Sequence, residues 1–405
     1  MSGIFIVGAK RTPFGSFGGS FKKAMTATQL GVVSTKAALA QANNLDHADH
    51  VIFGNVIGSS ADSAYLARHI GLKSGLDQST PAVTINRLCG SGFESIIQGA
   101  NLIKLGEADI TVCGGTENMS MAPLLSYGTK SRWGGPPLGA GLHLEDALWS
   151  GLTDAHTGTP MGVTAENLAV QYDISREACD EYAIRSQQRW AAAHEAGVFD
   201  AELAPVEIPG RKRGTTTMVT TDEHPRPETT FEKISGLPPV FKKDNGVVTA
   251  ANSSGISDGA GTIILASEEA VKKHNLTPLA RLVSHAVTGC DPTIMGIGPV
   301  EAIRQAMKRA SLSSESPNEV FDRIEINEAF AAQFLACAKA LDLDMEKTNI
   351  HGGAIALGHP LGASGSRIAA HLVNDLAADG TTSQRSVGAA CIGGGQGIAI
   401  VLERV

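Results

Sequence analysis

The 405-residue sequence lacks the patterns of membrane, secreted and nucleic-acid-binding proteins. No apolar run reaches the roughly 18 residues of a membrane helix. A secretory signal has basic residues before its apolar stretch, and none precedes the short apolar start here. The six cysteines form no C-x-x-C pair, which argues against a disulfide framework or a zinc site. With 41 acidic and 33 basic residues the net charge is −8, so no nucleic-acid partner is expected. We therefore expect a protein of a reducing compartment, without a metal or a membrane span.

Acidic residues are also missing from the start of the chain, because none precedes Asp46. Five basic residues occupy the same stretch: Lys10, Arg11, Lys22, Lys23 and Lys36. An acid-poor start that contains Ser and Thr is typical of mitochondrial transit segments. A basic surface strand and loop that begins the fold explains the composition equally well, and the sequence leaves both interpretations open.

Glycine, by contrast, is abundant, with 46 residues and no fixed G-X-Y period. Apolar residues make up 42% of the chain and charged residues 18%, a balance that allows a sizeable core. The length suggests two or three domains. Glycine is used where the backbone turns sharply or approaches a ligand closely, so glycine-rich turns indicate where a site would lie.

Strands and helices alternate in the first and last thirds of the chain. The expected strands are residues 4–7, 51–57, 82–85 and 110–112 in the first third, and 279–287, 321–326, 386–392 and 398–402 in the last. One helix is expected to begin after Gly92, and three more are expected in the last third, at 299–310, 329–341 and 362–376. In each third a turn of small residues precedes a helix, and a turn of cysteine and glycines follows it. We infer an internal duplication of an α/β unit, with a mostly parallel sheet and helices on its faces.

The middle of the chain differs in composition, being rich in Gly, Pro, Thr and charge. We expect one amphipathic helix over 176–196, opened by Ser175, with loops over 132–141 and 209–227. The predicted organisation is a first core half formed by 1–120 and 250–278, an inserted loop domain at 121–249, and a second core half at 279–405.

Cys89 lies at a strand-to-helix junction, next to Gly90 and three residues before Gly92. The free N–H groups and positive dipole of a helix N-terminus stabilise a thiolate. A sharp turn of this kind also exposes a nucleophile and aims backbone N–H groups at a developing oxyanion. A buried structural cysteine is the ordinary alternative, and the flanking glycines argue against it.

Three further motifs lie in the last third. His359 stands before Pro360 in a glycine-lined turn, and its ordinary pKa suits proton transfer near neutrality. Cys391 opens a turn with three consecutive glycines, which leaves backbone N–H groups exposed. Asn327 ends an expected strand, where its amide is able to orient a water or an oxygen. Of the four motifs, the one that contains Asn327 is the weakest evidence for a catalytic site when taken singly.

In this order, the four motifs resemble those of the thiolase family. Residues 86–95 look like its acyl-enzyme cysteine signature, 327–331 its Asn motif, 358–365 its His motif and 391–397 its second-cysteine motif. The resemblance covers essentially the whole chain and is greatest to mitochondrial-type 3-ketoacyl-CoA thiolases. It implies an α/β fold of two duplicated halves, with mixed five-stranded sheets in αβαβα layers, plus an inserted loop domain.

The resemblance also implies roles in acyl transfer. Cys89 would hold the acyl group, and His359 would take its proton and help to stabilise a thioester oxyanion. Cys391 would act as acid and base at the acetyl-CoA carbon. Asn327 would hold a water in one oxyanion hole, and the N–H groups of Cys89 and Gly393 would form the other. Cleaving a carbon–carbon bond between a ketone and a thioester needs such a soft nucleophile, a charge-stabilising pocket and a proton donor.

Coenzyme A is the implied co-substrate, with no tightly bound cofactor. Family correspondence places Ser254 and Phe241 at the pantetheine and Met161 in the pocket lining. The basic cluster that contains Arg211 and Arg213 is a candidate for the nucleotide phosphates, although a solvated turn is at least as good an explanation. Neither G-x-x-x-x-G-K-[ST] nor G-x-G-x-x-G occurs, so P-loop and Rossmann phosphate sites are not supported.

Two positions depart from related sequences. Short-chain thiolases carry His before Met-Gly, whereas Thr159 and Pro160 precede Met161 here. The loss of a polar ring leaves apolar room, so we expect acyl chains longer than acetoacetyl to be accepted. His351 stands where related sequences usually have Asn, and we expect it to make a structural polar contact.

The leading hypothesis is degradative 3-ketoacyl-CoA thiolysis through a Cys89 acyl-enzyme. The alternatives are biosynthetic condensation of two acetyl-CoA molecules by the same residues, and an inactive acyl-CoA-binding scaffold. A ketosynthase would be expected to carry a second His in place of Cys391. The resemblance implies a homodimer or a homotetramer held by the inserted domain. The chain does not end in a peroxisomal S-K-L. Between the two remaining locations, the resemblance and the acid-free start favour the mitochondrial matrix over the cytoplasm.

Overall fold

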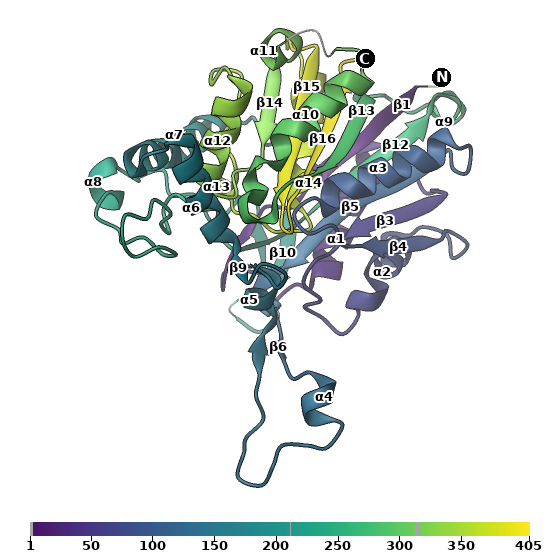
Figure 1. Cartoon of the computed structure of the whole chain (residues 1–405). Helices are drawn as coiled ribbons and strands as arrows, with labels where there is room; N and C mark the ends of the chain where they lie inside the picture. Colours follow the sequence, from purple (N-terminus) through teal and green to yellow (C-terminus); the bar gives the residue numbers. More distant parts are fainter. Residues whose placement is uncertain (1–2, 211, 313–315) are drawn as a thin grey trace.

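A mixed sheet runs through the computed structural model, which describes residues 3–210, 212–312 and 316–405 (Figure 1). Its strand order is β4-β3-β5-β12-β1-β13-β16-β15-β14. The strands are β1 (Ile4–Arg11), β3 (His50–Gly54), β4 (Ala82–Ile85), β5 (Ile110–Asn118), β12 (Ser257–Ser267), β13 (Ala280–Gly289), β14 (Arg323–Ile326), β15 (Arg385–Ile392) and β16 (Gln396–Glu403). The short β2 (Gly15–Ser16) pairs with β12.

The sheet consists of two halves with the same order. Strands β4-β3-β5-β12-β1 form the first half and β14-β15-β16-β13 the second, and two residue pairs between β1 and β13 join them. The fifth position of the second half is a single parallel bridge between Ile324 and Thr348. The expectation of a mostly parallel sheet is wrong, because only β3–β4, β3–β5 and β14–β15 are parallel among the neighbours in this order. Strands β12 and β16 return by antiparallel pairing, which allows a tight turn such as that between β15 and β16.

Two aspartates show the duplication at the level of hydrogen bonds. Asp49, just before β3, accepts the N–H groups of Asp109 and Ile110 at 2.8 Å each. Asp322, just before β14, accepts those of Gln384 and Arg385 at 2.7 and 3.2 Å. In both halves a carboxylate therefore fixes where the second parallel strand begins.

Helices cover both faces of the halves and fill the space between them. The central pair is α3 (Ser91–Lys104) and α14 (Ser364–Ala377), which pack against each other and against β5 and β12. A Cβ atom at Gly92 would lie 2.4 Å from the backbone nitrogen of Ser366, and one at Gly365 would lie 2.4 Å from that of Phe93. The two helices therefore meet backbone to backbone at their first turns.

The three largest apolar cores among the described residues confirm the αβαβα layering. One fills the centre around α3 and α14, and the other two lie outside the first and second halves. The outer helices of the first half are α1 (Ala27–Gln41), α2 (Leu66–Ser74) and α9 (Glu268–Lys273), and those of the second half are α10 (Gly298–Arg309), α11 (Pro317–Val320), α12 (Ala331–Leu341) and α13 (Ala354–Leu357). Residues of the acid-free start form β1 and α1, so this stretch belongs to the folded body.

Residues 119–256 form one long connection between β5 and β12. Its helices include α5 (Ala147–Gly151), α6 (Met161–Tyr172), α7 (Arg176–Glu195) and α8 (Phe231–Ile234). Its strands pair as three hairpins: β6 (Leu124–Leu125) with β7 (Glu145–Asp146), β8 (Thr153–Asp154) with β9 (Thr159–Pro160), and β10 (Val206–Pro209) with β11 (Thr216–Val219). Helix α7 begins after Ser175, whose hydroxyl accepts the N–H of Ala178 at 3.1 Å, as predicted from the sequence. Helix α6 was not predicted. Residues 124–146 form an arm, with α4 (Gly128–Ser131), that extends away from the body (Figure 1).

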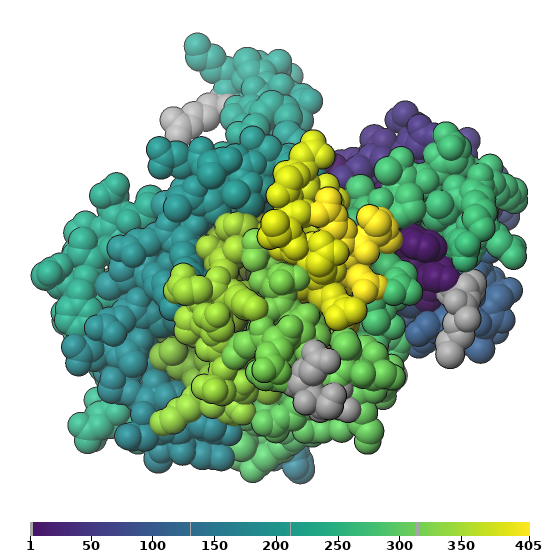
Figure 2. All heavy atoms as spheres, turned by 90° about the horizontal axis from the view of Figure 1, so that it is seen from above, coloured from purple at the N-terminus to yellow at the C-terminus, as the bar shows by residue number. Residues whose placement is uncertain are grey.

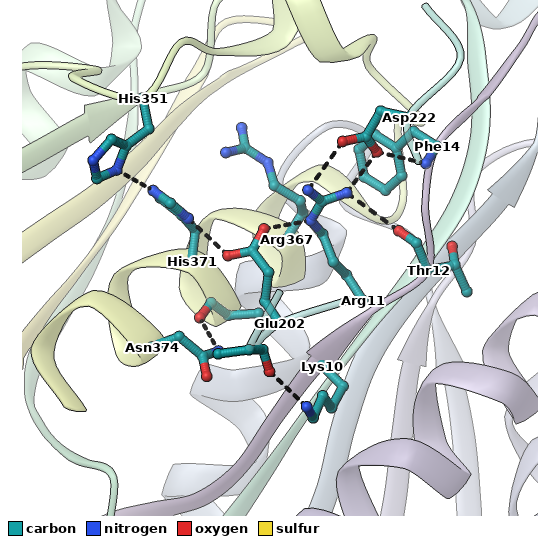
Figure 3. Close-up of polar contacts among 12 residues, drawn as sticks. Lys10, Arg11, Thr12, Phe14, Glu202, Asp222, His351, Arg367, His371 and Asn374 are labelled. Atoms are coloured by element: carbon teal, nitrogen blue, oxygen red, sulfur yellow. Dashed lines mark hydrogen bonds and ion pairs between the residues drawn. The ribbon is translucent and has the colours of Figure 1, made fainter. Parts of the chain in front are cut away.

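A buried ion network attaches this connection to the core (Figure 3). Arg11 of β1 is fully buried and pairs with Glu202 at 2.5 Å and with Asp222 at 2.6 Å, both of which lie in the connection. Glu202 also binds His371 of α14 at 2.7 Å. The inserted segment is therefore held to both halves by charges inside the molecule.

The start of the chain and its last strands lie on one face (Figure 2). In Figure 2 the end of the chain, in yellow, lies near the start, in dark purple, in agreement with the β1–β13–β16 pairing. Among the described residues, no helix combines the length and the apolar character needed to span a membrane. The domain boundaries predicted from the sequence remain a prediction.

Candidate active site

Cys89 lies in a tight turn between β4 and α3. Leu88 has a positive φ of 47°, a conformation that costs a branched residue energy and is held by its surroundings. The N–H of Leu88 donates to Asn86 Oδ1 at 2.9 Å, and the Ser91 hydroxyl donates to the Leu88 carbonyl at 2.7 Å. The turn leaves the Cys89 side chain half-buried at the edge of a cavity.

Backbone N–H groups converge on the Cys89 sulfur. Burial raises the pKa of the Cys89 thiol to about 11, the N–H groups of Gly393 and of Cys89 itself oppose this rise, and the nearby Glu117 adds to it. The resting sulfur is therefore protonated and requires a base. The two N–H groups come from the ends of different halves, the arrangement expected of an oxyanion hole.

His359 is buried and lines the same cavity. The hydroxyl of Ser364 donates to the Pro360 carbonyl at 3.0 Å, so it accepts a hydrogen bond from His359 Nδ1 at 2.5 Å. Nδ1 therefore carries the proton, and Nε2 keeps its lone pair. Burial, with the cation of Arg367, lowers the pKa of His359 to about 4. The ring is neutral near pH 7 and its free nitrogen is available as a base.

Asn327 lies beside His359 at the end of β14. Its Nδ2 is 3.4 Å from His359 Nε2, and its buried Oδ1 has no hydrogen-bond partner among the described residues. A buried amide oxygen of this kind normally has a partner, so the position fits a polar ligand or a bound water. The geometry agrees with the predicted role, which remains a prediction.

The neighbouring Glu328 explains the second residue of the Asn motif. Its carboxylate accepts the hydroxyls of Tyr182 and Ser186 at 2.7 Å each, the amide of Asn349 at 2.9 Å and the N–H of Ile355 at 3.1 Å. Glu328 therefore ties the end of β14 to α7 and to the start of α13.

Cys391 lies near the end of β15 in a small apolar cluster with Met295 and Ala329, both of which line the cavity. Burial raises the pKa of its thiol well above the ordinary value, and a charge on Cys89 raises it further. Cys391 is therefore a protonated thiol at rest, which suits a proton donor.

The cavity measures about 510 Å³. The predicted coenzyme A contacts Met161, Phe241 and Ser254 line it together with Cys89 and His359. A pocket of this size is typical of small-molecule sites. Most of the lining is apolar, and three of the lining residues pack with Ile57 in an apolar group that adjoins Cys89: Met119, Leu152 and Leu361.

The predicted phosphate contacts fare differently. Arg211 lies outside the described residues, and Arg213 lies between β10 and β11 and does not line the cavity. Sequence reasoning missed Arg226, which lines the cavity and whose guanidinium donates to the carbonyls of Glu223, His224 and Pro225. Arg226 lies between two prolines in a loop that has few glycines and no motif. Nothing in the local sequence therefore distinguished it from other surface arginines.

His351 makes the structural polar contact expected of it. Its Nδ1 is 2.9 Å from Nε2 of His371, which in turn binds Glu202 (Figure 3). His351 does not line the cavity. No group of three or more His, Cys, Asp or Glu in the described part of the chain is arranged to hold a metal ion.

The fold and this site together define a thiolase. The model of the N-terminal thiolase domain matches residues 4–269, and that of the C-terminal domain matches residues 276–404. The chain belongs to the thiolase family.

Within the family, the chain is similar to mitochondrial 3-ketoacyl-CoA thiolases. It is 56% identical to the Homo sapiens enzyme over 404 residues, which cover 100% of this chain and 98% of that protein. It is also 45% identical over 406 residues to acetyl-CoA acetyltransferase of Escherichia coli (strain K12), with full coverage of both. The crystal structure of human mitochondrial 3-ketoacyl-CoA thiolase in complex with CoA superimposes with a TM-score of 0.93 at 55% identity, over 100% of this chain and 98% of that one.

Proposed function

We propose that this thiolase cleaves 3-ketoacyl-CoA with coenzyme A, through an acyl group held on Cys89, to give acetyl-CoA and a shortened acyl-CoA. The observation that carries the proposal is the meeting of Cys89, His359 and the Gly393 N–H at one apolar cavity. The similarity to 3-ketoacyl-CoA thiolases supports it.

In the first half-reaction His359 Nε2 takes the Cys89 proton, and the thiolate attacks the ketone carbon. The N–H groups of Cys89 and Gly393 stabilise the resulting oxyanion. The bond between C2 and C3 then breaks, and its electron pair passes to the departing thioester as an enolate. Protonated His359 and a water on Asn327 stabilise the enolate oxygen, and Cys391 gives its proton to C2.

The second half-reaction restores every proton. The thiol of coenzyme A gives its proton to the Cys391 thiolate and attacks the thioester on Cys89. The Cys89 sulfur leaves and recovers its proton from His359. Because each thiol ends as it began, the same residues run the reaction in either direction.

Steady-state thiolysis across acyl lengths tests the proposal and the predicted tolerance of long chains. The site is lined mostly by apolar side chains, and the short β9 strand, Thr159–Pro160, places no histidine before Met161. We expect 3-ketoacyl-CoAs of six to twelve carbons to be cleaved with kcat/KM at least as high as that for acetoacetyl-CoA. Activity with acetoacetyl-CoA alone would favour the biosynthetic alternative, and no activity with any length would overturn the proposal.

For coenzyme A itself, we propose contacts from Ser254, Phe241 and Met161, with Arg226 rather than Arg213 nearest the phosphates. All four proposed residues line the cavity. Arg226→Gln is expected to raise KM for coenzyme A while leaving kcat little changed, and Arg213→Gln is its matched control.

Two surfaces support an oligomer. Strand β4 has β3 as its neighbour on one side and forms an edge of the described sheet, with Val83 40% exposed, and such an edge is a template for pairing with a second copy. The arm carries exposed apolar side chains, namely Leu124, Trp133, Leu138, Leu142 and Leu144. We assign the β4 edge to a dimer and the arm to the contact between dimers. Replacing 128–142 by a short glycine linker should convert tetramers to dimers in analytical ultracentrifugation, and an unchanged mass ratio would refute the role of the arm.

The mitochondrial matrix is the proposed location, since relatives at 56% identity are named mitochondrial. Fluorescence of the tagged full chain in cells distinguishes this location from the cytoplasm.

A further inference from the structure

Glu117 is a fully buried acid at the end of β5 that the proposed chemistry does not use. Its carboxylate accepts four hydrogen bonds, each at 3.0 Å. Oε1 accepts the N–H of Ile57 and the side-chain amide of Asn55, and Oε2 accepts the N–H groups of Val56 and Gly362. Three of the four donors are backbone groups, so the carboxylate mainly fixes the main chain.

These donors belong to two segments that flank the active site. Gly362 lies in the turn between His359 and Ser364, the residue that orients the His359 ring. Ile57 packs with Leu361 in the apolar group that adjoins Cys89. One carboxylate therefore joins the loop beside the nucleophile, from the first half, to the turn of the base, from the second half.

The surrounding backbone shows how closely the halves approach at this point. A Cβ atom at Gly115, two residues before Glu117, would lie 1.8 Å from the carbonyl oxygen of Gly362. A glycine is required there, and the turn of residues 360–364 rests directly on β5. Glu117 accepts one hydrogen bond from this turn, from the Gly362 N–H, and this bond fixes the turn in position.

We infer that Glu117 is a positioning residue for thiolysis, because its carboxylate holds the His359 turn and the loop beside Cys89 in register across the two halves. The inference rests on the proposed function. An ionised carboxylate has about four lone-pair sites, and all four are occupied by N–H donors. An amide or a protonated acid would place its own hydrogen against one of these donors.

A second buried acid, Asp258, acts on Glu117. Burial raises the pKa of Glu117 to about 7, and the carboxylate of Asp258 on the neighbouring strand β12 adds to the rise. Across the site Glu117 in turn raises the pKa of the Cys89 thiol. Replacing Glu117 by an uncharged residue therefore has two separable effects, a loosened turn and a more acidic Cys89.

Asp258 provides the matched control. It is also buried, its pKa is also raised by burial, to about 6, and it also accepts a backbone N–H, that of Ser120 at 2.9 Å. It has no hydrogen bond with the His359 turn or with residues 55–57 among the contacts described. Asp258→Asn thus reports the general cost of neutralising a buried acid at this end of the sheet.

The test compares Glu117→Gln with Asp258→Asn in the full-length enzyme. For Glu117→Gln we expect kcat for thiolysis to fall about 100-fold, as misplacement of a catalytic group by about 1 Å does, with KM little changed. We also expect iodoacetamide to alkylate Cys89 at lower pH than in the wild type, because a negative charge has gone. Asp258→Asn should lose comparable thermal stability and retain kcat.

Loss of activity with a more acidic nucleophile is a signature that general destabilisation does not produce. Equal falls of kcat in both variants, or an unchanged kcat in Glu117→Gln, would overturn the inference about Glu117. The proposed function would still stand in that case, because the wild type would still catalyse thiolysis. An inactive wild type, by contrast, would overturn the proposed function itself. If Glu117→Gln does not fold, hydrogen exchange in the wild type decides, since the Gly362 amide should lose protection as pH falls below 7, and constant protection would refute the inference.

Discussion

The two halves of the molecule differ most in one connection. In the first half, residues 119–256 join β5 to β12, and in the second half residues 393–395 join the corresponding strands β15 and β16. The long connection supplies Met161, Phe241 and most of the cavity wall. The short one supplies the Gly393 N–H that points at the Cys89 sulfur.

This difference separates substrate binding from chemistry. The turn of three glycines is confined by the pairing of Ile392 with Gln396, which fixes both of its ends, and Gly394 and Gly395 adopt the positive φ that so tight a turn requires. A long connection is free to vary in shape, but it needs attachment to the core, and Arg11 provides this through Glu202 and Asp222. The duplicated scaffold thus carries a rigid catalytic turn on one side and a variable binding wall on the other.

Removing the attachment of the long connection should have the largest effect. Arg11→Met removes the cation that Asp222 and Glu202 share and leaves Glu202 paired with His371 alone, and breaking such a buried pair costs about 3–5 kcal/mol. Denaturant unfolding measures the loss. The matched control is Lys10→Met on the same strand, whose amine donates to the Ala201 carbonyl at an exposed site and should matter little. Equal losses in the two variants would show that the buried network does not hold the connection.

The short connection is tested by deleting one donor. Gly393→Pro removes the N–H beside Cys89 and should lower kcat about 10²- to 10³-fold, the usual effect of losing one oxyanion-hole donor. Gly394→Asn is the control in the same turn, because a side chain at this position would point into open space and Asn tolerates positive φ. If both variants lose kcat to the same extent, the shape of the turn is what catalysis needs, and the Gly393 N–H has no specific role as an oxyanion-hole donor.

Narrowing the wall of the long connection should change specificity rather than chemistry. Leu152→Trp fills apolar space beside Cys89, so kcat/KM for a ten-carbon 3-ketoacyl-CoA should fall about tenfold relative to acetoacetyl-CoA. Leu138→Trp on the exposed arm should leave the chain-length profile unchanged. A uniform loss at every length would mean that acyl chains lie elsewhere.

The smallest predicted effect is the pH dependence of the attachment. Burial is the largest single influence and opposes the charge of His371, but the charge and hydrogen bond of Glu202, together with the charge of Glu325, outweigh it, so the pKa of His371 is raised. A raised pKa stabilises the fold fully below the unfolded value of about 6.5, and the contribution is lost as pH rises through the folded pKa. The stability difference between wild type and His371→Gln should therefore shrink as pH rises above about 6.5 in thermal unfolding. A constant difference would contradict a protonated His371.

Much of this could be predicted from the sequence, and the failures have physical causes. The glycines around Cys89, His359 and Cys391 revealed the catalytic turns, because only close backbone approach demands them. Strand direction was wrong, since alternation of strands and helices does not report the antiparallel return of β12 and β16. Glu117 and Arg226 carried no local signal, because their roles depend on contacts between segments far apart in the chain.

Trapping the acyl group tests the account most directly. The enzyme is mixed with a ten-carbon 3-ketoacyl-CoA without coenzyme A, quenched in acid and analysed by peptide mass spectrometry. The account predicts an eight-carbon acyl group on the peptide that contains Cys89, with Cys391 and the other cysteines unmodified. An acyl group on a different residue, or release of acetyl-CoA without any acylated peptide, would contradict it.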